Sequence, residues 1–508
     1  MTAYSPTALR AQLKKVAEAA ITADLAKRGW RKDAGGGYYG VDWHPSLPAP
    51  TGPTGTIKVT LAQNVEGSVG ASEGLPGMTL IEGSRDHYVA GVFELDPWES
   101  IYQPWHERIE TAFQAWDEIP DHAEFEPLVE ACRQAVAKTT LDAGNTQQGG
   151  DLTADGDLYP AIDFIHRWIG PDSPGAYTGQ TIAAYDWSYG AARIATVVGN
   201  QRQAMIAAGL CLAGAQSLWA KAGSDITRLA ESAEVAFENL KSEGFDLALV
   251  KAFVDVAKTF AVGPLAPLGT GLGVVSGVVS GAEAVKLAVS KISPQDVAPA
   301  VDPAIEGSSA DDVYNKLQDV LWATGSALYE QERALIDPLK TMVGDMVGDT
   351  NGYHIHPQEG VDPDLAAGDT INVDSYALIK ALGTAVPIVV AKLADAANCL
   401  DEAARETPWI RPLPRGYGTN GAWPELSVLT SYTAQVARSS GNELVEAQRL
   451  LATALGLIED VDEDTRAILQ GYQADLKDAG TATPEVPDNT RYEDYPRGPM
   501  PYPRAWPY

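Results

Sequence analysis

The feature that most constrains the fold is the stretch from Trp168 to Leu240, in which a turn is followed by about sixty-five residues without proline. A repeat of 3.5 residues held over many turns predicts a helix that supercoils against a partner helix. At 1.5 Å per residue this helix would be roughly 100 Å long, so the sequence predicts an elongated protein. The residues that repeat at alternating spacings of four and three are Ile194, Val198, Gln201, Met205, Ala208, Leu212, Ala215, Trp219, Ala222, Ile226, Leu229, Ala233, Ala236 and Leu240.

These fourteen residues, which we call the seam, are apolar or small with the exception of Gln201. A buried polar residue in a coiled coil can fix the register of the helices. Alternatively, Gln201 lies at the edge of the seam and is solvated. We expect Leu212, Trp219, Ile226 and Leu229 to make the main packing contacts of the seam.

Composition restricts the class of partner. The chain has 508 residues with 45% hydrophobic content, enough for two or three modules or one long bundle. Its formal charge of -31 argues against a nucleic-acid surface, because such a surface needs clustered Lys and Arg. The three cysteines, Cys132, Cys211 and Cys399, lie far apart among apolar residues, which is typical of buried free thiols.

The first helix is expected over residues 6 to 28, where Gly29 ends it. This amphipathic segment has no apolar core of a signal peptide. We therefore expect a cytoplasmic location, or export by a route that needs no cleavable leader.

The predicted fold is mainly α: an elongated helical bundle with coiled-coil hairpins and a small N-terminal cap rich in β-strands and loops. The strands of the cap are expected at 56–61, 78–82 and 87–95. The predicted modules are an N-terminal helix with the cap (1–95), a helical hairpin (96–145), a long-helix bundle (155–348), C-terminal helical hairpins (370–479) and a Pro/Tyr-rich arm (480–508).

Further helices are predicted from apolar periodicity and capping signals. Residues 308 to 347 begin with an acidic capping segment and carry leucine or methionine at seven-residue spacing, at Leu321, Leu328, Leu335 and Met342. The segment 348–374 is predicted to be a loop, and 408–424 a Pro/Gly-rich connection. The other helices are expected at 96–118, 124–141, 159–168, 375–405 with a kink at Pro387, 425–458 and 462–477.

The segment 259–282 has no charged residue but many glycines, within a predicted apolar hairpin over 247–292. It is long enough to cross a membrane, although its glycines and prolines disfavour a straight span. Three interpretations remain: a buried hairpin, an apolar tip that faces a partner or another copy, and a membrane-inserting hairpin. Its candidate contact residues are Phe260, Leu265, Leu268, Leu272, Val275 and Val279.

No sequence motif indicates an enzyme or a cofactor. A phosphate-binding loop, a Gly-x-Ser-x-Gly nucleophile motif and a His-Glu-x-x-His zinc motif are all absent from the sequence. The histidine cluster is His354 and His356, in the predicted loop, where we expect a solvated segment in preference to a metal site.

Two features together resemble the Trp-x-Gly superfamily of type VII secretion, in particular its large actinobacterial members. One is the tripeptide from Trp168 to Gly170 between a short and a long helix. The other is the pair Asn200 and Gln201, followed by Leu218 to Ile226, an apolar Gly-rich segment and another long helix. The resemblance covers residues 155 to 475. It implies helical hairpins that pair into bundles and export without a cleavable leader.

That family carries an export signal of the form Tyr-x-x-x-Asp/Glu after a hairpin. This chain matches it at Tyr38/Asp42 and at Tyr159/Asp163, although neither match follows a predicted hairpin. The resemblance therefore implies a non-enzymatic interaction protein that associates with itself or with other proteins through its long helices. The alternatives are a membrane-inserting protein like the helical pore-formers, and a structural subunit of a filament or phage-type assembly.

Overall fold

The computed structural model describes residues 4–27, 30–32, 37–40, 58–61, 78–81, 101–141, 158–169, 180–240, 309–358, 375–413 and 416–454. The mainly α prediction is confirmed for these residues. The apolar hairpin with its six candidate residues, Gly170, the predicted strand at 87–95, the helix at 462–477 and the C-terminal arm lie outside the described residues.

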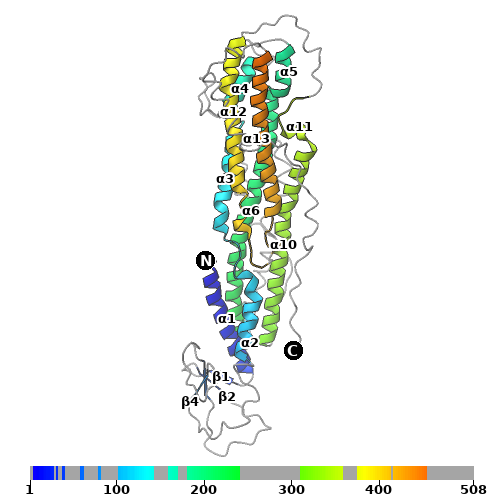
Figure 1. Cartoon of the computed structure of the whole chain (residues 1–508). Coiled ribbons are helices and arrows are strands. Elements are labelled where there is room, and N and C mark those ends of the chain that lie inside the picture. The colour runs from blue at the N-terminus through cyan, green and yellow to red at the C-terminus, as the bar shows by residue number, and fades with distance from the viewer. Residues whose placement is uncertain are drawn as a thin grey trace, which may run out of the picture.

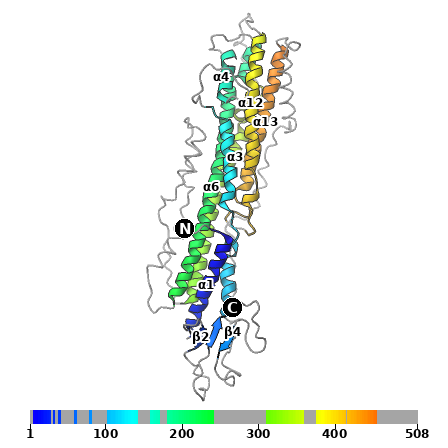
Figure 2. The ribbon, with the colours of Figure 1, turned by 90° about the vertical axis from the view of Figure 1, so that its left-hand side faces the viewer.

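The molecule is an elongated assembly of helices around α6 (Ala191–Asn239), which Figures 1 and 2 show running along most of the helical part. Its 49 residues correspond to a length of about 70 Å. The other long helices are α10 (Ala310–Gly348), α12 (Ser375–Ala403) and α13 (Trp423–Ala454). The shorter ones are α1 (Pro6–Lys27), α2 (Gln103–Phe113), α3 (Glu126–Lys138), α4 (Leu158–Ile169), α5 (Gln180–Tyr189) and α11 (Thr350–Tyr353).

Two bundles share α6 and α10. The lower bundle in Figure 1 contains α1 and α2 with the C-terminal half of α6 and the N-terminal half of α10. The upper bundle contains α3, α4, α5, α12 and α13 with the remaining halves of α6 and α10. Between them lie the short helices η3 (Gln114–Trp116), η4 (His122–Phe125) and η6 (Thr407–Trp409) and the loop after η6, a level that we call the waist.

Four short strands form an antiparallel sheet in the order β1 (Trp30–Lys32), β2 (Gly37–Gly40), β3 (Lys58–Leu61), β4 (Met78–Ile81). The register pairs Arg31 with Tyr39 and Val59 with Leu80. The sheet lies beyond α1 at the lower end of Figure 1. β3 and β4 fall within two of the predicted strands, whereas β1 and β2 were not predicted.

The prediction of one uninterrupted long helix is wrong, because α5 and α6 are separated at Gly190. The backbone of Gly190 is extended, with ψ of 170°, which ends α5 and begins α6. The Gly190 amide donates to Asp186 O (2.9 Å), and the Ile194 amide donates to Gly190 O (3.0 Å). A Cβ at residue 190 would lie 2.4 Å from Asp186 O, so the junction requires glycine.

Helix capping agrees with the sequence at two N-termini. The Ser5 hydroxyl accepts from the Ala8 amide (3.1 Å) just before Pro6 begins α1. The Ser309 hydroxyl accepts from the Asp312 amide (3.3 Å), and the acids of the first turn of α10 favour the helix dipole. Pro387 lies inside α12, which continues past it.

The buried seam gives a test of the core. We expect Leu229→Ala on α6 to lower the free energy of unfolding by about 2–5 kcal/mol, because Leu229 is fully buried and its truncation leaves a cavity. The matched control is Leu450→Ala on α13, whose side chain is 52% exposed and which should change stability little. Urea denaturation of both variants measures the difference, and equal losses would contradict the assignment of the core.

Candidate functional site

The seam is buried within the molecule and is covered by other helices of the same chain. Leu212, Trp219, Ile226 and Leu229 are buried, and the helices packed on α6 are α1, α3, α4, α5, α10, α11 and α13 of the same molecule. Twelve of the fourteen seam residues are buried, and Ala236 and Leu240 are partly buried against the core. Another chain could pair with this seam only if these helices were displaced.

Trp168 is partly buried near the end of α4. It packs against the core, with its ring 6.2 Å from that of Phe164. In the described part of the chain, the tryptophan of the Trp-x-Gly tripeptide is therefore a packing residue of the upper bundle.

Gln201 anchors a segment that we call the strap, residues 349–358. The strap comprises α11 and the residues after it, and it crosses α6 in the upper bundle. The Gln201 side-chain amide donates to Tyr353 O (2.7 Å) and to Ser440 Oγ (3.1 Å). The neighbouring Asn200 donates to Gly352 O (2.8 Å). Gln201 is thus buried and bonded to residues of other helices, as expected for a buried polar residue that could fix the register. The interpretation that Gln201 is solvated at the edge of the seam is wrong.

Side chains of other helices bond the rest of the strap. Ser440 of α13 accepts from the amide of the fully buried Ile355 (3.0 Å). Arg193 of α6 donates to His354 O (3.0 Å), and Ser188 of α5 accepts from the Gln358 amide (3.0 Å). The predicted loop contains the short helix α11 and has no regular secondary structure from His354 to Gln358, whereas the prediction that this segment is solvated is wrong, because it docks on α5, α6 and α13.

The two histidines of the strap lie close together. Their ring centroids are 5.6 Å apart, and His354 Nε2 lies 2.8 Å from Ser439 Oγ on α13. Burial, together with His356 and Arg193, lowers the pKa of His354 to about 4. Among the described residues, no group of three or more His, Cys, Asp and Glu side chains could hold a metal ion.

A buried ion pair holds the waist together. Glu332 of α10 and Arg411, in the loop after η6, are both buried and make two parallel contacts of 2.6 and 3.0 Å. Glu332 also accepts from the Tyr417 amide (2.6 Å), and the Arg411 guanidinium lies 4.7 Å from the ring centroid of Trp219 on α6. This group of four residues, which we call the pin, joins α6, α10 and the loop.

Two glycines make room for the pin. Gly416 has φ of +61° and Gly421 has φ of +55°, a conformation that favours glycine. A Cβ at Gly416 would lie 2.1 Å from Glu332 Oε2, and one at Gly421 would lie 2.3 Å from Arg411 Nη2. The glycines of the predicted Pro/Gly-rich connection therefore let the backbone approach the ion pair closely.

Burial acts on both members of the pair. It raises the pKa of Glu332, whereas Arg411 and the Tyr417 amide lower it. Burial also lowers the pKa of Arg411, and Glu332 opposes this change. The pair was missed in the sequence, although Glu332 lies four residues after Leu328 and three before Leu335, on the apolar face of its helix. A charged residue on the apolar face of a helix was the signal in the sequence that could have indicated a buried ion pair.

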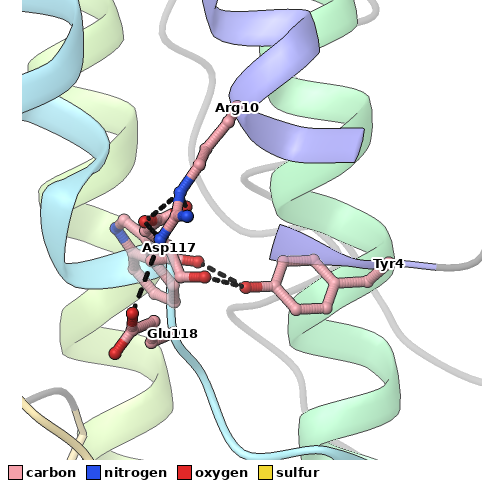
Figure 3. A network of polar contacts seen from close by, with 5 residues as sticks. Tyr4, Arg10, Asp117 and Glu118 are labelled. Carbon is pink, nitrogen blue, oxygen red and sulfur yellow. Dashed lines mark hydrogen bonds and ion pairs between the residues drawn. The ribbon is translucent and has the colours of Figure 1, made fainter. Parts of the chain in front are cut away.

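The N-terminus of α1 is attached to the waist by a polar network (Figure 3). The Tyr4 hydroxyl donates to the carbonyls of Trp116 (2.8 Å) and Asp117 (2.9 Å). Arg10 forms ion pairs with Asp117 and Glu118. The Tyr4 side chain lies directly over Gly223 of α6, where an added Cβ would be 2.7 Å from the Tyr4 Cβ. Burial is the main cause that raises the pKa of Tyr4 to about 12.

A groove with a volume of about 520 Å³ lies beside this network, between α1 and the helical segment from α2 to Asp117. Leu13, Ala17 and Phe113 contribute apolar atoms to its wall, and side chains of both charges, such as Lys14 and Glu110, line the rest. Among the described residues that line the groove, His106 makes no hydrogen bond with a carboxylate.

Cys132 and Cys211 are buried and Cys399 is partly buried, all three as free thiols. Burial is the main cause that raises the pKa of each thiol, to about 12 for Cys132. Raised pKa values favour the unreactive thiol form, so these cysteines act as small core residues.

The fold and these clusters define a class: a mainly helical, elongated protein whose buried polar groups connect helices to one another. Comparison with known proteins adds no narrower assignment, since no family model, curated protein or solved structure matches this chain.

The pin can be tested by removing one or both charges. We expect Arg411→Ala to lower the free energy of unfolding by about 3–5 kcal/mol, because Glu332 would remain buried without its counterion. The double variant Glu332→Leu with Arg411→Met should be far less destabilised, because it leaves no buried charge. The control, Arg133→Ala in the exposed pair with Glu130, should cost at most about 1 kcal/mol. A double variant as unstable as the single one would contradict this account.

Gly223 tests the attachment of Tyr4. We expect Gly223→Ala to destabilise the protein by about 1–3 kcal/mol, because the new methyl group meets atoms next to the Tyr4 backbone and the start of α1 must shift. Gly344→Ala on α10 is the control, since no atom lies within 4 Å of its added Cβ, and should stabilise the helix by up to about 1 kcal/mol.

A double-mutant cycle isolates the contact. In a Tyr4→Gly background, which lacks both the Cβ and the ring of residue 4, the clash is gone, so Gly223→Ala should lose most of its cost. An undiminished cost in that background, measured by urea denaturation, would show that Tyr4 is not the obstacle.

Proposed function

We propose that this chain is a non-enzymatic helical interaction protein of the type VII secretion kind, which contacts partner proteins or further copies of itself through the outer faces of its helices. The observation that carries the proposal is the use of its buried polar groups. The strap, the pin and the Tyr4 network each join helices of the same chain.

The order of elements supports the choice of family. A short helix, α4, ends near Trp168; the short helix α5 and the long helix α6 follow, and α6 packs against a second long helix, α10. The resemblance implies such a hairpin of long helices. The expected partners are proteins, because a net charge of -31 repels the phosphates of nucleic acids. Since the seam is covered within the chain, partners would contact other surfaces.

A membrane-inserting function is the alternative, and one observation favours it. In the described residues two helical segments are long and apolar enough to cross a membrane, Ile182–Asn239 and Leu382–Trp409. Their apolar windows are 78% and 56% buried in the fold, as expected for core helices of a bundle, so insertion would require the bundle to open. The third alternative, an assembly subunit, depends on residues 480–508, outside the described part.

Export distinguishes these functions. We expect the protein to accumulate in the culture filtrate of its producing strain and to be retained when the type VII motor ATPase is deleted, with a cytoplasmic marker as the control for lysis. Trp168→Ala should reduce export, whereas Trp187→Ala, which changes a tryptophan that is 51% exposed on α5, should not.

Equal amounts outside the cell with and without the motor would contradict the secretion proposal. In that case, leakage of lipid vesicles on addition of the purified protein would favour the membrane alternative.

A further inference from the structure

The strap is attached in an unusual way. In the described structure, its bonds to α5, α6 and α13 come from side chains, those of Ser188, Arg193, Asn200, Gln201, Ser439 and Ser440. It shares no backbone ladder with these helices, so it can detach without unwinding them. Segments held in this way open locally at a lower free energy than the core.

We propose that the strap is an acid-released latch, in which protonation of His354 detaches residues 353–358 from α6 and α13 while both helices remain folded. This inference is independent of the proposed function, because it concerns a conformational change that secretion, assembly or membrane insertion could each use.

The surroundings of His354 favour its neutral form. Its ring is more than half buried between α6 and α13 and contacts Ser439 through Nε2. The two groups that act on it, Arg193 of α6 and His356 of the strap, both disfavour a proton on its ring. A proton on His354 would therefore place like charges together in a poorly solvated site. The Arg193 side chain also holds His354 O, so the same repulsion acts on a bond that retains the strap.

Other charged groups face the strap without reversing this effect. Asp349 acts on Arg193, Asp345 of α10 acts on Tyr353, and Glu443 of α13 acts on His356. Burial raises the pKa of Glu443, so its attraction for His356 weakens in the acid range in which His354 gains a proton. None of these carboxylates is among the groups that act on His354 directly.

The direction of the pH effect follows from the two pKa values. In the docked strap the pKa of His354 is about 4, whereas its ordinary value is 6.5. Docking is therefore fully favoured above pH 6.5, and it weakens as the pH falls from 6.5 towards 4, because the released state binds the proton more readily.

Hydrogen exchange of the full-length protein tests the latch. We expect the protection of the Ile355 and Gln358 amides, which bond to Ser440 and Ser188, to fall on the order of tenfold or more between pH 6.5 and pH 4 after correction for intrinsic exchange rates. Amides in α12 and the middle of α6 should keep their protection. In His354→Gln, which retains a hydrogen-bonding side chain but cannot titrate, the protection of the strap should change little over this range.

The control is His122→Gln, in η4 at the waist, which should behave as the wild type. Three results would overturn the proposal: wild-type strap protection that does not change with pH, an equal loss in His354→Gln, or a loss of protection in α6 and α12 at the same pH as the strap.

Discussion

The structure depends on one requirement: the apolar face of α6 must be buried along its whole length. A helix of 49 residues exceeds the dimension of an ordinary globular core, so no single layer of neighbours can cover it. Different helices therefore cover the two halves of α6. α1 covers the lower half, and α3, α4 and α13 cover the upper half, while α10 packs along it as a second long helix. The elongated shape follows from this arrangement.

Polar groups inside this core then fix how the helices fit together. Apolar packing tolerates sliding of helices, because hydrophobic attraction has no direction. The buried hydrogen bonds of Gln201, Glu332 and Arg411 do not tolerate such sliding. A shift of one residue would leave each of these side chains without a partner, at a cost of several kcal/mol. The pin contacts α6 at Trp219, and the strap contacts it at Gln201. The pin thereby connects α6 to the loop that follows α12 and η6, and the strap is the segment that follows α10.

The burial of these polar residues and of the seam restricts the surfaces that other molecules could contact. Polar residues that bond within the core are not available to a substrate, and the seam that could have paired with another chain is already covered. What remains for recognition is the outer surface and the segments outside the described residues. Our proposal of an interaction protein is based on these conditions, because partner binding by outer faces needs no convergent catalytic groups.

Much of the fold could be predicted from sequence alone because it is encoded locally. The heptad spacing indicated the buried face of α6, and the acidic capping segment indicated the start of α10. The break at Gly190 was missed, because a single glycine within a helical pattern does not reveal its backbone conformation.

The polar contacts were decided only by the tertiary structure. Gln201 and Tyr353 are 152 residues apart in sequence, and Glu332 and Arg411 are 79 apart. Periodicity specifies which face of a helix is buried, but it does not specify which helix covers that face. A polar residue on such a face is therefore ambiguous until its partner is known, and the packing of the helices supplies that partner.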